Sequence, residues 1–128
     1  FRGANMTTDR LIQVAAAAVS ATQRKLPPDI RELARSIPVH YELLPGPDVL
    51  AEGFPDAILG FFTGNAHGTE LDQTNPAPPQ ILLYVENLWD FAEGNETIFR
   101  REARLTYLPE LGHYLGWDAD EVAARGLD

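Results

Sequence analysis

The sequence predicts an α+β fold, in which a small mixed sheet of three to four strands packs on an N-terminal helix and on a long helix near the C-terminus. Three observations lead to this prediction. Apolar residues recur at helical spacing near both ends of the chain. Three short apolar or alternating segments lie between them, as strands require. Proline- and glycine-rich stretches separate these segments.

Length and composition indicate one ordinary globular domain. The 128 residues suffice for a modest core. We take residues 6–128 as a single domain, and residues 1–5, which precede Met6, as an upstream extension or a remnant of cloning. Hydrophobic content of 45% and charged content of 23% are typical of soluble proteins. The net charge of −9 argues against nucleic acid or an anionic membrane surface as the partner.

The chain has no cysteine, which excludes disulfides, thiol catalysis and thiolate metal sites. A metal would need carboxylates, water or the three histidines, His40, His67 and His113. No apolar run reaches the length of a membrane span, and no signal peptide is evident. We therefore expect a cytoplasmic protein without a membrane partner. The sequence does not indicate an oligomeric state.

The first elements follow from capping and spacing. Thr7 or Thr8 can cap a helix that starts at Asp9 and runs to about Gln23. Pro28 suits the first position of a short second helix that continues through residue 34. In residues 38–44, apolar and polar side chains alternate, which predicts a strand with one buried face. His40 falls on its less buried face.

Residues 45–48 predict a turn, and two more strands follow. Residues 57–63 are apolar on both sides, which favours a central strand. Residues 64–79 form a long loop of the kind that is often functional. Residues 80–85 predict a third strand, and we expect the edge formed by residues 81–85 to accept an extended peptide by backbone pairing.

The long helix dominates the end of the chain. Residues 87–91 predict a short helical segment that offers Leu88, Trp89 and Phe91 to the core. Asn95 can cap the long helix, Gly116 can end it, and Asp118 can cap a last turn that reaches Ala124.

The long helix has two faces. One face carries four leucines and is predicted to be buried, namely Leu105, Leu108, Leu111 and Leu115. The other is predicted to face a cleft beneath the third strand, and it carries Glu102, Thr106, Pro109, Glu110 and His113. We assign Thr106, Pro109 and Tyr84 to the lining of this cleft.

The stretch from Pro109 to His113 is a variant of the zinc-binding motif His-Glu-x-x-His. In that motif, two histidines four residues apart lie on one face of a helix and bind one ion, while the glutamate activates a metal-bound water. Glu110 and His113 occupy the second and fifth positions, but Pro109 occupies the first. Proline offers a metal no donor atom.

The order of the elements and several short motifs resemble the small bacterial zincin-like metallopeptidase family, which has a minimal zincin fold. The resemblance implies that the long helix is of the active-site type, that zinc is the cofactor, and that Glu110 is the general base. The segments that carry it are Leu26-Pro27-Pro28, Leu59-Gly60-Phe61-Phe62-Thr63-Gly64, Ile81-Leu82-Leu83-Tyr84, Asn87-Leu88, Glu110-Leu111-Gly112-His113-Tyr114-Leu115-Gly116 and Asp120-Glu121-Val122.

The family pattern is His-Glu-x-x-His-x-x-Gly-x-x-Asp, in which the two histidines and the aspartate bind zinc. Here the first histidine is replaced by Pro109 and the aspartate by Ala119, so two of the three ligands are absent. Asp118 and Asp120 flank the third ligand position, and His67 could reach the site from the long loop.

Three interpretations remain open at this point, and whether the protein is an enzyme is open with them. One of them is a soluble protein whose cleft has no role, and the other two assign a function. The first is a domain with a degenerate zinc site, inactive and without tightly bound zinc, that keeps the cleft as a peptide- or partner-binding module. The second is a metal-dependent peptidase with altered ligands and Glu110 as the general base. Its metal ligands would be His113, Asp118 or Asp120, with His67 as a further candidate.

Overall fold

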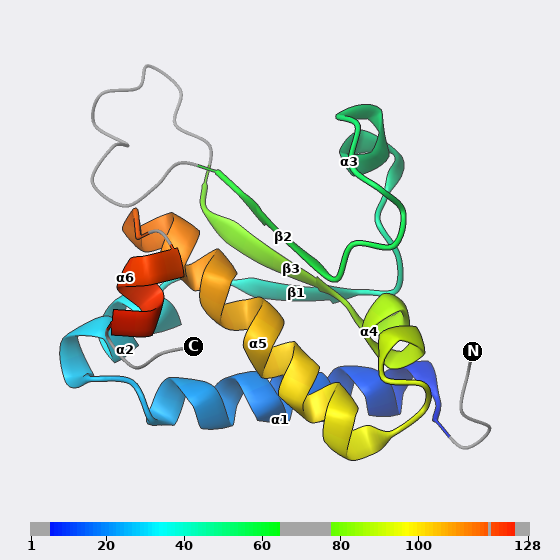
Figure 1. The fold of residues 1–128 in the computed structure, drawn as a ribbon, viewed down its shortest axis with the longest axis horizontal. Coiled ribbons are helices and arrows are strands. Elements are labelled where there is room, and N and C mark those ends of the chain that lie inside the picture. Colours follow the sequence, from blue (N-terminus) through cyan, green and yellow to red (C-terminus); the bar gives the residue numbers. More distant parts are fainter. Residues whose placement is uncertain (1–5, 65–77, 118, 125–128) are drawn as a thin grey trace.

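The computed structural model describes residues 6–64, 78–117 and 119–124. Figure 1 shows short strands placed between helices, and the fold is of the predicted α+β class. In order, the elements are α1 (Thr8–Arg24), α2 (Pro28–Arg35), β1 (Val39–Glu42), α3 (Pro47–Ala51), β2 (Gly60–Thr63), β3 (Gln80–Tyr84), α4 (Val85–Phe91), α5 (Glu96–Leu115) and α6 (Ala119–Ala124).

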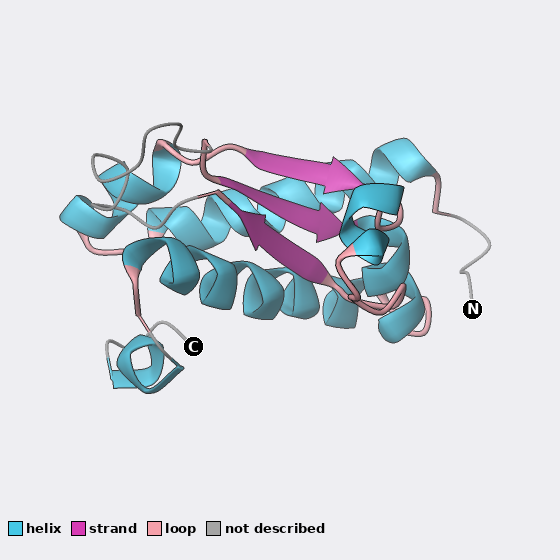
Figure 2. Cartoon of the chain, turned by 90° about the horizontal axis from the view of Figure 1, so that it is seen from above, coloured by secondary structure: helices cyan, strands magenta, loops and turns pink. Residues whose placement is uncertain are grey.

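The strands form a three-stranded mixed sheet in the order β1-β3-β2. β1 pairs with β3 in parallel, and β2 pairs with β3 antiparallel. Figure 2 shows the strands side by side over the helices, and α5 packs against α1 and against strands β2 and β3. The mixed sheet and its two supporting helices are therefore as predicted.

The order of the strands corrects two predictions. The segment expected at a peptide-accepting edge, residues 81–85, contributes to β3, which has a neighbour on each side. Its unbroken apolar run is typical of a strand buried on both faces. β2, expected to be central, is an edge strand. Its side chains are apolar because α5 covers one face while Phe54 packs on Phe61 on the other, with ring centroids 4.8 Å apart.

Local signals placed the first helix correctly. The Thr7 hydroxyl accepts a hydrogen bond of 3.1 Å from the backbone N–H of Arg10 and so caps α1. One face of α1 packs against α5, where the Gln23 amide donates to the Tyr107 hydroxyl over 3.0 Å. Tyr107 is fully buried. This bond gives the tyrosine a partner inside the core.

Helix α5 begins and ends where the sequence predicts. The Asn95 side chain accepts from the N–H of Ile98 over 3.0 Å. At the other end, Gly116 adopts a left-handed conformation with φ of 76°. The N–H of Trp117 then donates to the carbonyl of Gly112 over 2.8 Å, which satisfies an otherwise unpaired carbonyl. Between these caps, α5 runs through Pro109 without interruption.

The buried face of α5 is broader than the four leucines indicate. Leu108 and Leu111 are buried as predicted, but Leu105 is 38% exposed, so its prediction was wrong. The reason is that α5 is covered on two sides, by α1 and by the sheet, and Leu105 lies just outside the covered arc of the helix. The buried positions of α5 are Phe99, Ala103, Tyr107, Leu108, Leu111, Gly112 and Tyr114.

Two smaller elements differ from the predictions. The second half of the turn predicted at residues 45–48 is instead the start of the short helix α3, which the sequence did not indicate. In α4, Leu88 and Trp89 are buried as expected, whereas Phe91 is 58% exposed and does not join the core. Most of the predicted long loop, together with Asp118, lies outside the described residues. Within the part that the structure describes, no helix is both long and apolar enough to cross a membrane.

Candidate functional site

A close approach between α5 and the sheet positions the candidate site. A Cβ atom at Gly60 of β2 would lie 2.6 Å from Cγ2 of Thr106, closer than real Cβ contacts allow. Glycine therefore lets the helix lie directly on the strand. As a result, the second half of α5, which carries Glu110 and His113, runs along the edge strand β2.

Glu110 and His113 interact with each other on this stretch of helix. The Glu110 Oε1 atom lies 3.0 Å from His113 Nδ1, as suits residues three positions apart on one helical face. The Glu110 side chain is 15% exposed, and that of His113 is 60% exposed. Burial raises the pKa of the Glu110 carboxyl, and the charge and hydrogen bond of His113 oppose this rise. The pair thus joins a sheltered carboxyl to an exposed imidazole.

Phe62 of β2 forms the wall beside this pair. Its ring lies edge-on to the His113 ring with centroids 6.5 Å apart, and 6.3 Å from the ring of Tyr114. Because side chains alternate along a strand, Phe62 shares the α5 side with Gly60, while Phe61 lies on the other side. Sequence reasoning did not assign Phe62 to the site, although this alternation, combined with the edge position of β2, would have indicated it.

In this structure a long helix lies beneath an edge strand, and its Glu-x-x-His pair faces that strand. A comparison with known families agrees with this arrangement. The model of the zincin-like metallopeptidase family matches residues 34–127, most of the chain. The chain belongs to this family. No curated protein matches it. In zincin-like terms, α5 is the helix that carries the motif, and zinc is the cofactor that the family implies.

The structure brings only some of the predicted site residues together. Thr106 is half-buried against Gly60, and Pro109 is exposed on the same helix, one position before Glu110. Tyr84 projects from the opposite face of the sheet and does not join them. Asp120 is exposed on α6. Asp118 and His67 lie outside the described residues.

The residues that the structure describes do not fit the zinc of a zincin-like peptidase. A catalytic zinc needs three protein ligands that converge on one point. One turn before His113, the helix presents Pro109, whose ring is hydrocarbon. Across the described ranges, no three histidine, aspartate or glutamate side chains gather closely enough to hold a metal ion. We therefore derive no catalytic step through zinc.

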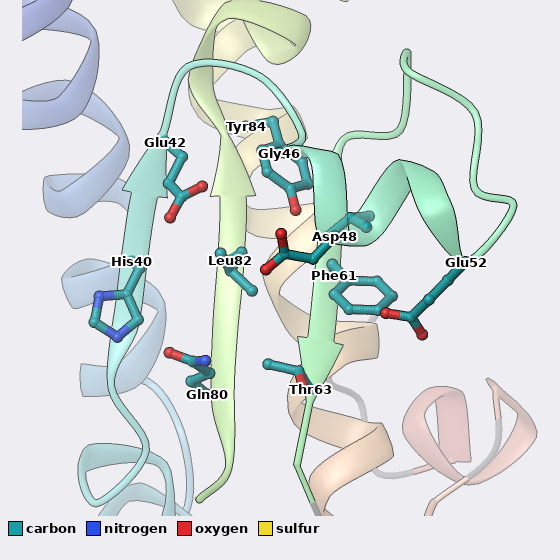
Figure 3. Close-up of a pocket in the computed structure, with 11 residues that line it drawn as sticks. His40, Glu42, Gly46, Asp48, Glu52, Phe61, Thr63, Gln80, Leu82 and Tyr84 are labelled. Carbon is teal, nitrogen blue, oxygen red and sulfur yellow. The ribbon is translucent and has the colours of Figure 1, made fainter. Parts of the chain in front are cut away.

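A second polar region, which sequence reasoning missed, lies on the face of the sheet away from α5. Figure 3 shows a cavity there, lined by the three strands and by α3. The signals that could have indicated it are the polar residues His40 and Glu42 on one face of β1, and the acidic pair Asp48 and Glu52 one helical turn apart. Each signal alone is typical of an ordinary solvated surface.

Proposed function

We propose that this zincin-like domain is not a zinc peptidase, and that it binds an extended peptide segment along the free edge of β2. The observation that carries the proposal is Pro109 at the position of the first zinc ligand, on a helix that otherwise keeps its place beneath the edge strand. The acid and the histidine of the motif bind each other instead. With Pro109 at the position of the first ligand, the means of activating a metal-bound water is lost.

The backbone of β2 supports pairing with a peptide. The carbonyl of Leu59 accepts a hydrogen bond of 3.0 Å from the N–H of Tyr84, so Leu59 directs its backbone toward β3. Because such pairs alternate, Phe61 and Thr63 also direct their backbone groups toward β3. Gly60 and Phe62 direct theirs outward, where no further strand is described. A peptide strand can pair with these outward groups.

Side chains of a bound peptide would also meet the motif pair. Alternate residues of a strand added beside β2 point toward α5. There they lie near His113, whose ring is largely exposed, and near the sheltered carboxyl of Glu110. A carboxylate in such a place is a strong hydrogen-bond acceptor for an N–H or O–H group of the peptide. Backbone pairing would supply affinity, and this pair would supply selectivity.

Metal analysis separates this proposal from the altered-ligand peptidase. Protein purified without a metal-affinity step should retain far less than one equivalent of zinc after dialysis, measured by inductively coupled plasma mass spectrometry. We expect this because too few protein ligands are present, and one imidazole with loosely placed carboxylates binds zinc weakly. One tightly held equivalent would favour the peptidase, with His113 and Asp118 or Asp120 among its ligands.

The binding half of the proposal can be tested with peptides selected from a random library displayed on phage. A selected peptide should shift the backbone amide resonances of β2 in spectra of ¹⁵N-labelled protein. Two variants then isolate the backbone contribution. Phe62→Ala removes the ring and keeps the outward N–H, whereas Phe62→Pro removes both. The proline variant should bind at least several-fold more weakly, because it lacks that donor.

Equal affinities of the two folded variants, or resonance shifts confined to other surfaces, would overturn pairing at β2. The zinc result stands apart from this test. If the protein holds no zinc and no peptide binds at β2, then the proposal of a degenerate zinc site stands and the proposal of peptide binding fails.

A further inference from the structure

The face of the sheet opposite α5 contains an acidic cavity of about 400 Å³. Figure 3 shows its lining, to which all three strands and α3 contribute. Three of the side chains are carboxylates, Glu42, Asp48 and Glu52, and His40 lies beside them on β1. None of the described residues that line the cavity is a lysine or an arginine. The cavity therefore has an acidic lining without a lysine or arginine among the described residues to balance it.

The fold brings these groups together from distant parts of the chain. His40 and Glu42 share one face of β1 because side chains alternate along a strand. Glu42 is the register partner of Tyr84 on β3, which places the two side chains next to each other. Asp48 projects from α3 over the sheet, and Glu52, the residue that caps the end of α3, lies near Phe61.

Tyr84 provides an independent indication of a ligand. Its side chain is completely buried, and its hydroxyl has no hydrogen-bond partner among the described residues. Buried hydroxyls are rarely left without one. In Figure 3 the hydroxyl points into the cavity, toward Asp48. Burial, followed by the charge of Glu42, raises the pKa of Tyr84, so the group remains a neutral phenol. A phenol oxygen can accept a hydrogen bond from a donor placed in the cavity.

We propose that this cavity binds an alkylammonium ion, with Tyr84 and the surrounding carboxylates as acceptors. An ammonium group has three N–H donors and no acceptor, so it complements a phenol oxygen flanked by carboxylates. A metal ion suits the cavity less well, because the described residues place no three metal-ligating side chains close enough together. The side chains of Glu42 and Asp48 belong to exposed residues and can rotate to admit the ligand.

Two sources can supply this chemistry, a free alkyl diamine or the side chain of a lysine residue. The site is distinct from the proposed peptide edge, because it uses the other face of the sheet. Its test is therefore independent of the function proposed for β2.

Isothermal titration calorimetry at low ionic strength tests the proposal with two probes. One is diaminobutane, and the other is an acetylated and amidated pentapeptide with a single lysine among alanines. At least one should bind, and Tyr84→Phe should weaken that binding about tenfold, as expected for the loss of one hydrogen bond to a charged group. Asp48→Asn should weaken it at least several-fold. The probe that binds identifies the source.

Glu32→Gln is the matched control, because it removes the same charge from an exposed position on α2, outside the cavity. Its affinity should equal that of wild type. Chemical shifts of ¹⁵N-labelled protein should change around Glu42 and Asp48 on titration, and the thermal unfolding of each variant checks its fold. The proposal is overturned if neither probe binds, if Tyr84→Phe binds as wild type does, or if Glu32→Gln weakens binding as much as Asp48→Asn.

Discussion

Glu110 illustrates how much of the chemistry of this domain depends on single side chains. In the zinc-binding pattern, the glutamate is used as a base beside a metal-bound water. Here its neighbour is Pro109, and its own partner is His113. Desolvation raises its pKa although the histidine opposes the change. The carboxyl therefore makes a pH-dependent contribution to stability, whatever its functional role.

The first prediction concerns that contribution. Because the folded protein holds the Glu110 proton more tightly than the unfolded chain does, ionisation of this group favours unfolding. The stability that the protonated Glu110 contributes is fully present below the ordinary carboxyl pKa. It is lost as the pH rises through the raised pKa of Glu110 in the folded protein. Glu110→Gln cannot ionise, so its stability relative to wild type should be higher at neutral pH than near pH 4, roughly the ordinary carboxyl pKa.

Urea unfolding of both proteins across this pH range measures the difference. Repeating the comparison in a His113→Gln background serves as the control. Without the histidine, desolvation acts unopposed, and the trend should become larger. A stability difference that stays constant with pH in both backgrounds would contradict the expected direction of the pKa shift.

Pro109 gives a second prediction at the scale of one residue. It lies inside α5, where it cannot donate to the carbonyl of Leu105 and its ring crowds that turn. Its side chain is exposed, so little packing is lost on replacement. Pro109→Ala should raise the free energy of unfolding by about 2 kcal/mol, somewhat less than the full interior cost of proline. Urea denaturation measures it.

Arg101→Ala, at another exposed position of the same helix, is the control and should change stability by less than about 0.5 kcal/mol. If Pro109→Ala is no more stable than wild type, then the backbone of α5 is adapted to proline and the usual penalty does not apply.

At the scale of elements, the contact between α5 and β2 holds the candidate site in place. Gly60→Ala would bring a methyl group against Cγ2 of Thr106 and near the backbone oxygen of Leu82. We expect a loss of about 1–3 kcal/mol in the free energy of unfolding, the usual cost of overpacking. Thr106→Ser removes the opposing methyl group and should restore much of that loss.

We therefore expect a favourable coupling energy in the double-mutant cycle of Gly60→Ala and Thr106→Ser. Chemical denaturation of the four proteins measures this energy. Strictly additive effects would show that the helix and the strand do not meet at this point.

The elements also show which features the sequence could predict. Thr7, Asn95 and Gly116 were identified as capping or terminating residues, because their roles depend on bonds to residues a few positions away. The order of the strands depends on contacts between distant segments. β2 and β3 are both short and apolar, so local pattern cannot decide which is central. The exposure of Leu105 has the same origin, since α1 and the sheet together determine which arc of α5 is covered.

In the candidate site, too, the sequence could predict only those features that depend on residues close together in the chain. Glu110 and His113 were identified because the motif lies within one helix, and their pairing follows from their spacing. Phe62 was not, because its place beside His113 depends on β2 being the edge strand. Tyr84 was assigned to the cleft, yet strand alternation places it on the other face of the sheet. The sequence indicates the local chemistry of these residues, but it does not indicate which face of the sheet each side chain occupies.

At the scale of the whole molecule, the sheet separates two regions with different chemistry. On one face, α5 supplies the motif pair, with Phe62 beside it. On the other face lies the acidic cavity, to which β2 contributes Phe61 and Thr63. β2 therefore takes part in both regions, although they share no side chain. Substitutions at Glu110 or His113 should leave the cavity intact, so the two proposed sites can be studied separately.

The last prediction asks whether the whole scaffold still has the geometry of its family. Pro109→His with Ala119→Asp restores the complete family pattern, since Glu110, His113 and Gly116 are already present. The two histidines would lie one helical turn apart on α5, and Gly116 turns the chain toward position 119. Calorimetric titration should give at least a tenfold higher zinc affinity for the double variant than for wild type.

Pro109→Ala with Ala119→Asp is the matched control, because it also removes the proline but supplies no histidine. It should show little of the gain. If the double variant folds with normal thermal stability and yet binds zinc no better than this control, then α5 and α6 no longer bring the three ligand positions to one point. The loss of zinc binding would then reside in the arrangement of these helices as well as in the two substituted residues, and restoring ligands alone could not recover it.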